Sequence, residues 1–212
     1  MDGFVYDPAE DSVLLSEAVE YARGDVLELF AGKGVVGLEA AKKAKSVTFA
    51  DINQSSIKFI DQKIEENGLT NCKTVISDLF SDLAGLSFDV IYMNPPYLPG
   101  DRNGKDAAEL SISGGKDGYE LTIEALKQSK QHLKEGGEIY LIISTVYDVR
   151  KVYKALESIN FEFKVLDRKK FFFEELLLVK IYEKRGNNYS ERSIDSGSTD
   201  KFGGPNIQSK ER

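Results

Sequence analysis

The chain has 212 residues, of which 41% are hydrophobic and 30% charged, and its formal net charge at pH 7 is −7. This length favours a single domain, and the acidic balance argues against salt-driven binding to duplex nucleic acid. A single cysteine and a single histidine exclude an intrachain disulfide and a Cys/His zinc site, so we expect no metal and a reducing, cytoplasmic compartment. We also expect no membrane association, because no signal peptide and no apolar run of roughly 20 residues is found.

Strand-like and helix-like patterns alternate along the chain, which predicts an α/β fold with a mainly parallel sheet. The first helix is expected over 9–22, where Val13, Leu14, Ala18 and Tyr21 recur at helical spacing. The other expected helices cover 35–44, 54–67, 119–134 and 149–158. The expected strands cover 25–30, 46–50, 73–77, 88–93, 138–144, 162–167 and 176–183.

The stretch 98–118 is rich in Gly, Asp and Lys, and it is expected to form a long loop. The helix that follows it is expected to end at Gly136-Gly137, because glycine is a common helix stop. The sequence therefore predicts one irregular segment and one clear helix between the fourth and fifth strands.

The turn of the last expected hairpin combines three basic residues at 168–170 with three phenylalanines at 171–173. The phenylalanines are expected to pack into the core. The basic residues could contact an acidic partner or RNA, or simply be solvated. Beyond the hairpin the chain is rich in Ser, Asn, Gly and charge, so we expect a folded domain over 1–185 and a flexible polar tail over 186–212.

A glycine turn joins the first expected strand to the next helix. It reads Glu28-Leu29-Phe30-Ala31-Gly32-Lys33-Gly34, and glycine at such a turn lets a ligand approach the backbone closely. The acidic residue before the turn suits a ligand with a positive end, such as the methionine ammonium or sulfonium of S-adenosylmethionine. A turn that only packs the helix on the strand is the alternative.

Two further acidic residues end the second and third expected strands. Asp51 could accept hydrogen bonds from a ribose diol, or it could cap a helix. Asp78 could accept from an adenine amino group, or it could be a solvated loop carboxylate. Because open α/β sheets bind ligands at the carboxyl ends of their strands, Glu28, Asp51 and Asp78 together predict a site for S-adenosylmethionine.

The tetrapeptide Asn94-Pro95-Pro96-Tyr97 directly follows the fourth expected strand. Two consecutive prolines make a stiff, extended turn, because proline fixes its own φ and keeps the preceding residue out of the helical region. The Asn94 side-chain oxygen and the Pro95 carbonyl could each accept a hydrogen bond from a planar NH2 group, and Tyr97 could stack on it. This arrangement could orient a weakly nucleophilic nitrogen for methylation without a strong base. An ordinary proline-rich surface turn is the alternative.

Three segments of the chain match the motifs of a known family. They are 5–15, which contains Tyr6-Asp7-Pro8-Ala9-Glu10-Asp11-Ser12, then 27–37, and Asn94-Pro95-Pro96-Tyr97. Over about residues 4–183 the chain resembles the HemK-type glutamine methyltransferases of translation termination factors, and in particular their short archaeal and eukaryotic branch. Asn-Pro-Pro-Tyr alone is shared with adenine-N6 methyltransferases, so the segment before the first strand is the more specific element.

The resemblance implies a Rossmann-like class I methyltransferase fold, with a mainly parallel seven-stranded sheet, an antiparallel last strand and helices on both faces. It implies that the substrate is the Gln side-chain amide of the Gly-Gly-Gln loop in a peptide chain release factor. It also implies a small zinc-binding activator protein as partner, docked on an edge strand at Lys73-Thr74-Val75-Ile76. Carried over to matching positions, the cofactor residues are Ser12, Glu28, Gly32, Asp51, Asp78, Leu79 and Asn94, and the catalytic segment is Asn94, Pro95, Pro96 and Tyr97.

One residue departs from the family pattern. Phe30 stands where the family has the first glycine of its cofactor turn, so its side chain must point away from the ligand or narrow the pocket. Two other functions stay open. An adenine-N6 methyltransferase acting on RNA or DNA is disfavoured by the acidic charge, and a cofactor-binding scaffold without catalysis is disfavoured by an intact Asn94 and Tyr97.

Overall fold

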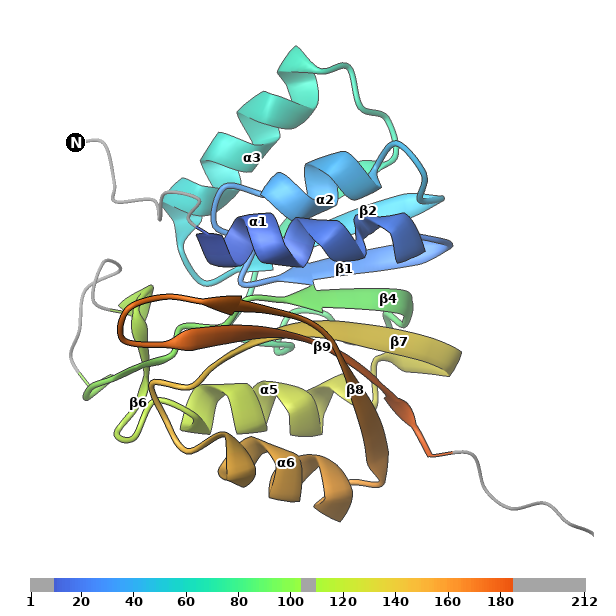
Figure 1. Cartoon of the computed structure of the whole chain (residues 1–212). Coiled ribbons are helices and arrows are strands. Elements are labelled where there is room, and N and C mark those ends of the chain that lie inside the picture. The colour runs from blue at the N-terminus through green and yellow to red at the C-terminus, as the bar shows by residue number, and fades with distance from the viewer. Residues whose placement is uncertain (1–9, 104–109, 185–212) are drawn as a thin grey trace, which may run out of the picture.

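The computed structural model describes residues 10–103 and 110–184, and these residues are built around one seven-stranded sheet (Figure 1). The strand order is β3-β2-β1-β4-β7-β9-β8. The strands are β1 (Asp25–Leu29), β2 (Ser46–Asp51), β3 (Cys72–Ile76), β4 (Phe88–Met93), β7 (Leu133–Ser144), β8 (Phe161–Lys170) and β9 (Glu175–Glu183). β9 is antiparallel to its neighbours β7 and β8, and the pairs from β3 to β7 are parallel, so the expected mainly parallel sheet is confirmed.

Helices cover both faces of the sheet, as expected (Figure 1). One face carries α1 (Glu10–Ser16), the 3-10 helix η1 (Glu17–Tyr21), α2 (Val35–Ala40) and α3 (Gln54–Glu66). The other face carries α5 (Glu120–Ser129) and α6 (Val149–Ser158). Both sheet faces are therefore buried, which explains why the parallel strands read as apolar runs rather than as an alternating pattern.

Strand β4 shows how one strand supplies two cores. Val90 and Tyr92 lie in the apolar cluster beneath α1 and α2, whereas Ile91 and Met93 lie in the cluster beneath α5 and α6. All four side chains are fully buried. This alternation follows from the two-residue period of a strand, and it places the residue after Met93 at the carboxyl edge of the sheet centre.

The segment expected to be a long loop contains two short strands. β5 (Leu98–Pro99) pairs in parallel with β6 (Ser113–Gly115), so the expectation of a wholly irregular stretch over 98–118 is wrong. Pairs this short depend on tertiary contacts and leave no periodic signal in the sequence.

The helix expected over 119–134 ends at Ser129, and strand β7 begins at Leu133, which pairs with Phe88 of β4. Gly136 and Gly137 therefore lie inside a strand and do not end a helix. Gly136 has a φ of 71°, and the pairing of β4 with β7 shifts between Phe88 and Val90. A glycine inside a strand with such a shift is typical of a bulge, which is the reading that the sequence analysis missed.

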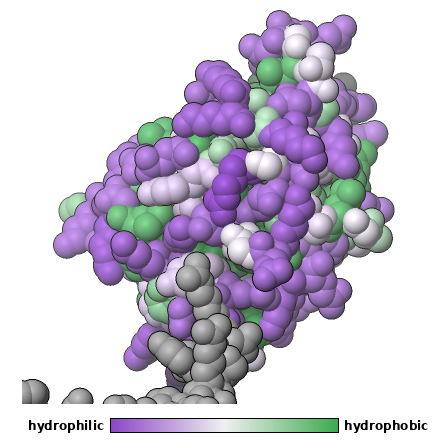
Figure 2. Space-filling model, turned by 90° about the vertical axis from the view of Figure 1, so that its right-hand side faces the viewer, coloured by the Kyte–Doolittle hydropathy of each residue, from purple (hydrophilic) through white to green (hydrophobic). Residues whose placement is uncertain are grey.

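One expectation about burial is also wrong. The three phenylalanines at 171–173 are exposed, with 92% exposure for Phe172 and 89% for Phe173, because the β8–β9 turn projects beyond the helices. One side of the molecule, shown in Figure 2, is mainly hydrophilic with small separate apolar areas, as is normal for a protein surface.

Two expectations lie outside the described residues. They are the motif residues Tyr6-Asp7-Pro8-Ala9 and the polar tail over 186–212, so the division of the chain at 185 stays a prediction. Among the described residues, no helix is long and apolar enough to cross a membrane.

Candidate functional site

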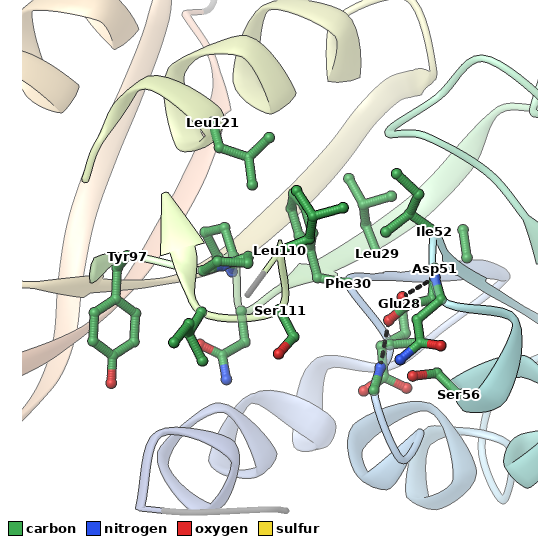
Figure 3. A pocket seen from close by; sticks show the side chains of 18 of the residues that line it. Glu28, Leu29, Phe30, Asp51, Ile52, Ser56, Tyr97, Leu110, Ser111 and Leu121 are labelled. Atoms are coloured by element: carbon green, nitrogen blue, oxygen red, sulfur yellow. Dashed lines mark hydrogen bonds between the residues drawn. The ribbon is translucent and has the colours of Figure 1, made fainter. Parts of the chain in front are cut away.

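A cavity of about 310 Å³ opens at the carboxyl edge of the parallel strands (Figure 3). It lies where the strand order reverses, since β1 is flanked by β2 on one side and by β4 on the other. Ligands of open α/β sheets bind at such a switch point. Every residue predicted for the cofactor or the catalytic segment lines this one cavity: Ser12, Glu28, Gly32, Asp51, Asp78, Leu79, Asn94, Pro95, Pro96 and Tyr97.

The turn after β1 has an unusual backbone. Phe30, Gly32 and Gly34 all have positive φ, at 60°, 53° and 70°. No heavy atom lies within 4 Å of a Cβ built on Gly32, so a ligand can approach the backbone there. Phe30 adopts a conformation that costs a non-glycine residue roughly 1–2 kcal/mol, and its ring lines the cavity, so it narrows this end of the pocket (Figure 3).

Glu28 is buried at the end of β1 and holds the first turn of α2. Its carboxylate accepts hydrogen bonds from the backbone N–H of Val36 at 3.3 Å and of Gly37 at 2.7 Å. Burial raises the pKa of Glu28 to about 8, against the opposing effect of the two hydrogen bonds. The carboxylate is therefore held in a poorly solvated place, where a cationic group would stabilise its charged form.

Asp51 connects the β1 turn to the end of β2. Its carboxylate accepts from the backbone N–H of Gly32 and from that of Asn53, each at 2.8 Å (Figure 3). The cap of α3 is Asn53, whose side chain accepts from the N–H of Ser55 at 2.9 Å. The alternative reading of Asp51 as a helix cap is therefore wrong, and burial raises the pKa of Asp51 beside the cavity.

Beyond β3, Leu79 has a φ of 53° and is buried, and its carbonyl accepts a 2.9 Å hydrogen bond from the Ser77 hydroxyl. Asp78 is exposed at the rim of the cavity. The sequence analysis missed Arg102, which also lines the cavity and donates to the carbonyls of Leu110, at 3.1 Å, and Ser113. Arg102 thereby holds the segment that begins at Leu110 against the pocket, and no local pattern distinguishes this arginine in the sequence.

Asn94 follows β4 and carries an unpaired acceptor. Its side-chain oxygen is buried and has no hydrogen-bond partner among the described residues. A buried oxygen without a partner costs free energy, so such atoms are rare unless something outside the chain occupies the position. The prolines Pro95 and Pro96 have no N–H to offer it. Asn94 itself lines the cavity, so its unpaired oxygen belongs to a residue of the cavity wall.

Tyr97 lies half-buried at the other end of the cavity from Glu28 and Asp51 (Figure 3). Burial raises the pKa of its hydroxyl, and the nearby carboxylates of Asp11 and Glu174 raise it further. Asp11 and Glu174 also line the cavity, although neither was predicted as a site residue. The tyrosine end of the cavity is therefore acidic, and its hydroxyl stays protonated.

Comparison with known proteins places this site in context. Residues 7–173 match the model of the family described as the methyltransferase small domain. A Methanocaldococcus jannaschii protein named "Putative protein N5-glutamine methyltransferase" is 35% identical over 84% of this chain and 91% of its own length. Ribosomal RNA small subunit methyltransferase C of Haemophilus influenzae is 33% identical over 61% of this chain, which corresponds to 35% of that enzyme.

Solved structures share the fold at lower identity. The ribosomal protein L11 methylase of Lactobacillus delbrueckii has a TM-score of 0.65 at 20% identity, over 86% of this chain and 83% of its own. The Mtq2-Trm112 complex of E. cuniculi, described as responsible for methylation of the eRF1 translation termination factor, has a TM-score of 0.65 at 24% identity. That match covers 87% of this chain and 100% of the other. Both support the expected fold.

Proposed function

The chain belongs to the methyltransferase small domain family and is an S-adenosylmethionine-dependent methyltransferase. We propose that it methylates the Gln side-chain amide in the Gly-Gly-Gln loop of a peptide chain release factor. The 35% identical relative supports a glutamine as acceptor through its name. The name of the Mtq2-Trm112 complex supports a termination factor as the protein that carries it.

The residues at the β1 and β2 ends fit the cofactor. Bound S-adenosylmethionine supplies an electrophilic methyl group on a positively charged sulfur. Glu28 would face its positive methionine end, Asp51 would accept from the ribose hydroxyls, and Asp78 would accept from the adenine amino group. Ser12, Gly32 and Leu79 complete the wall. The supporting observation is that a buried carboxylate and an open glycine backbone lie in one cavity.

The unpaired oxygen of Asn94 carries the catalytic proposal. An amide NH2 has two donors and a delocalised, weakly nucleophilic lone pair. The Asn94 oxygen would accept from one N–H and the Pro95 carbonyl from the other, which fixes the nitrogen and increases its electron density as it is attacked. Tyr97 would hold the amide plane by stacking. Such positioning can contribute roughly 7–11 kcal/mol at best to the lowering of a barrier.

A nucleic-acid substrate is the second candidate, and the ribosomal RNA methyltransferases among the relatives favour it. The alternative considered from the sequence is methylation of adenine N6, whose NH2 would fit the same two acceptors. The acidic side chains near Tyr97 argue against it, because Asp11 and Glu174 would repel a phosphate backbone. A protein loop has no phosphate groups, so these carboxylates would not repel it in this way.

We extend the proposal to a partner. β3 is an edge strand of the sheet, and it presents Ile76 at 48% exposure and partly exposed side chains at Thr74 and Val75. An open strand edge with apolar side chains is suited to receive an added strand. A small zinc-binding activator protein would cover this edge. A cytoplasmic location follows from the proposed substrate.

The test is a transfer assay with labelled cofactor, run with and without a zinc-binding activator. The acceptors are a release factor and an oligonucleotide, in separate reactions. Label should appear on the release factor, and the Asn94→Ala variant should lose transfer while it still binds the cofactor. Label on the oligonucleotide and never on protein would contradict the glutamine assignment.

A further inference from the structure

The turn between β8 and β9 carries an exposed aromatic pair. Phe172 and Phe173 are 92% and 89% exposed, and their rings pack edge to face with centroids 4.6 Å apart. The backbone N–H of Phe171 donates to the carbonyl of Glu174 at 2.8 Å, which closes the β8–β9 hairpin with Phe172 and Phe173 as the two residues of its loop. Large exposed apolar side chains that are held together in this way mark an interaction site more often than isolated ones do.

The turn is anchored beside the catalytic segment. The Ser144 hydroxyl, at the end of β7, donates to the carboxylate of Glu174. The backbone N–H of Thr145 donates to the carbonyl of Glu175 at 3.0 Å, and the backbone N–H of Glu175 donates to the Thr145 hydroxyl at 2.8 Å. β7 lies between β4 and β9, and the register places Met93, the last residue of β4, level with Val179 of β9. The turn therefore lies about 10 Å to the side of β4 and begins roughly 13 Å further along the strand direction, beyond the carboxyl end of β4.

Glu174 connects the cavity with the aromatic turn. It lines the cavity near Tyr97 and directly follows the two exposed phenylalanines. Three more exposed apolar side chains, Leu98, Ile112 and Val146, come from the segments around this end of the sheet. Figure 1 shows the β8–β9 turn on the side of the sheet where the parallel strands end. The cavity therefore opens next to an apolar surface.

We infer that Phe172 and Phe173 form a docking point for the substrate protein itself, outside the cavity that takes its reactive side chain. This inference rests on the proposed function. A macromolecule that inserts a side chain into the cavity comes close to the β8–β9 turn, because Glu174 lines the cavity and directly follows Phe173. Burial of two aromatic rings against that protein would supply binding energy far from the reacting atoms.

A folded protein fits this surface better than RNA. Exposed aromatic rings next to basic residues can stack on bases, and Lys169 lies 5.9 Å from the Phe171 ring. Yet Arg168 is paired with Glu175 at 3.4 Å, and the cavity side of the turn carries the carboxylate of Glu174. A strand of phosphates that followed the turn into the cavity would meet this negative charge, whereas an apolar protein surface would not.

The test compares a Phe172→Ser/Phe173→Ser variant with the parent chain, using a release factor and a short synthetic peptide of the same Gly-Gly-Gln loop. The KM for the release factor should rise about tenfold or more, while kcat changes by less than about twofold. The KM for the peptide and the dissociation constant of the cofactor should stay unchanged. Since both side chains are exposed, the melting temperature should not fall, and a Phe172→Tyr/Phe173→Tyr variant should restore the parent KM.

A Lys170→Ser variant on the same turn is the matched control, and it should leave the KM unchanged. An unchanged KM in the double serine variant would overturn the docking point, as would an equal, salt-sensitive loss with Lys170→Ser. A change in oligomeric state without a change in KM would assign the rings to self-association instead. If the parent chain methylates neither factor nor peptide, the proposed function fails as well, which is a distinguishable result.

Discussion

The carboxylate of Glu28 accepts a 2.7 Å hydrogen bond from the backbone N–H of Gly37, which joins the end of β1 to the first turn of α2. A Cβ built on Gly37 would lie 2.6 Å from a carboxylate oxygen of Glu28 and 2.4 Å from the Phe49 ring. Only glycine leaves room for this contact. The Glu28 carboxylate, which lines the cavity, is thus positioned by the backbone N–H of a residue that must be glycine.

Gly37→Ala should destabilise the protein and weaken cofactor binding together. Alanine normally stabilises a helix relative to glycine, but here the clash should outweigh that gain and cost about 1–3 kcal/mol of unfolding free energy. Denaturant unfolding and calorimetric titration with S-adenosylmethionine would measure both effects. Gly68→Ala is the control, because it strains a positive φ without meeting any atom within 4 Å, and it should leave cofactor affinity unchanged. A Gly37→Ala protein with parent stability would refute the packing argument.

The pKa of Glu28, raised by burial to about 8, predicts how stability and cofactor binding depend on pH. The folded state holds the proton more tightly than the unfolded state, whose value is near 4.5. Stability should therefore decrease as pH rises from about 4.5 to about 8. A cationic methionine end favours the carboxylate, so cofactor affinity should increase over the upper part of this range.

Glu28→Gln should flatten both pH profiles and lower cofactor affinity at pH 8 and above. Unfolding free energies and cofactor dissociation constants, measured at matched pH values for the variant and the parent, would test this. Glu66→Gln is the control, since Glu66 lies exposed on α3 and the pKa of its carboxyl is lowered by Lys63 rather than raised. The assignment of Glu28 to the cationic end would not survive identical pH profiles in variant and parent.

Asp51→Asn should weaken cofactor binding about tenfold or more. Both carboxylate oxygens accept from backbone N–H groups, of Gly32 and Asn53, and an amide would bring its NH2 against one of these donors. The unsatisfied donor should also cost about 1–3 kcal/mol of stability. Titration calorimetry and thermal unfolding would measure the two losses. Asp82→Asn, at an exposed position, should change neither, and unaltered affinity in Asp51→Asn would exclude a ribose contact.

The sequence predicted the fold well where the local pattern and the tertiary environment agree. Strand β4 and helix α6 (Val149–Ser158) were both placed with the bounds that the structure has. In the structure, the side chain of Asp148 caps the start of α6, so local sequence and tertiary environment favour the same boundary. The gathering of Glu28, Asp51 and Asn94 in one cavity followed from a general rule about the carboxyl ends of parallel strands.

The features of the fold and the site that were not predicted depend on contacts between segments distant in the sequence. The early start of β7 is accompanied by ion pairs of Lys134 with Asp25 at 2.6 Å and Asp89 at 2.8 Å, which no local pattern reveals. The role of Arg102 likewise depends on where the chain returns at Leu110. The exposure of the aromatic turn was missed because hydrophobicity predicts burial only when a neighbouring element covers the side chain.

The proposed role of Asn94 is to hold the amide of a release-factor glutamine with its side-chain oxygen, which is buried and has no partner among the described residues. Tandem mass spectrometry of a release factor incubated with the chain, S-adenosylmethionine and a zinc-binding activator tests it most directly. The prediction is one methyl group on the side-chain nitrogen of the Gly-Gly-Gln glutamine with the parent chain, and none with Asn94→Ala. An unmodified glutamine with the parent chain would rule out the proposed substrate, and full methylation by Asn94→Ala would rule out the proposed role of Asn94.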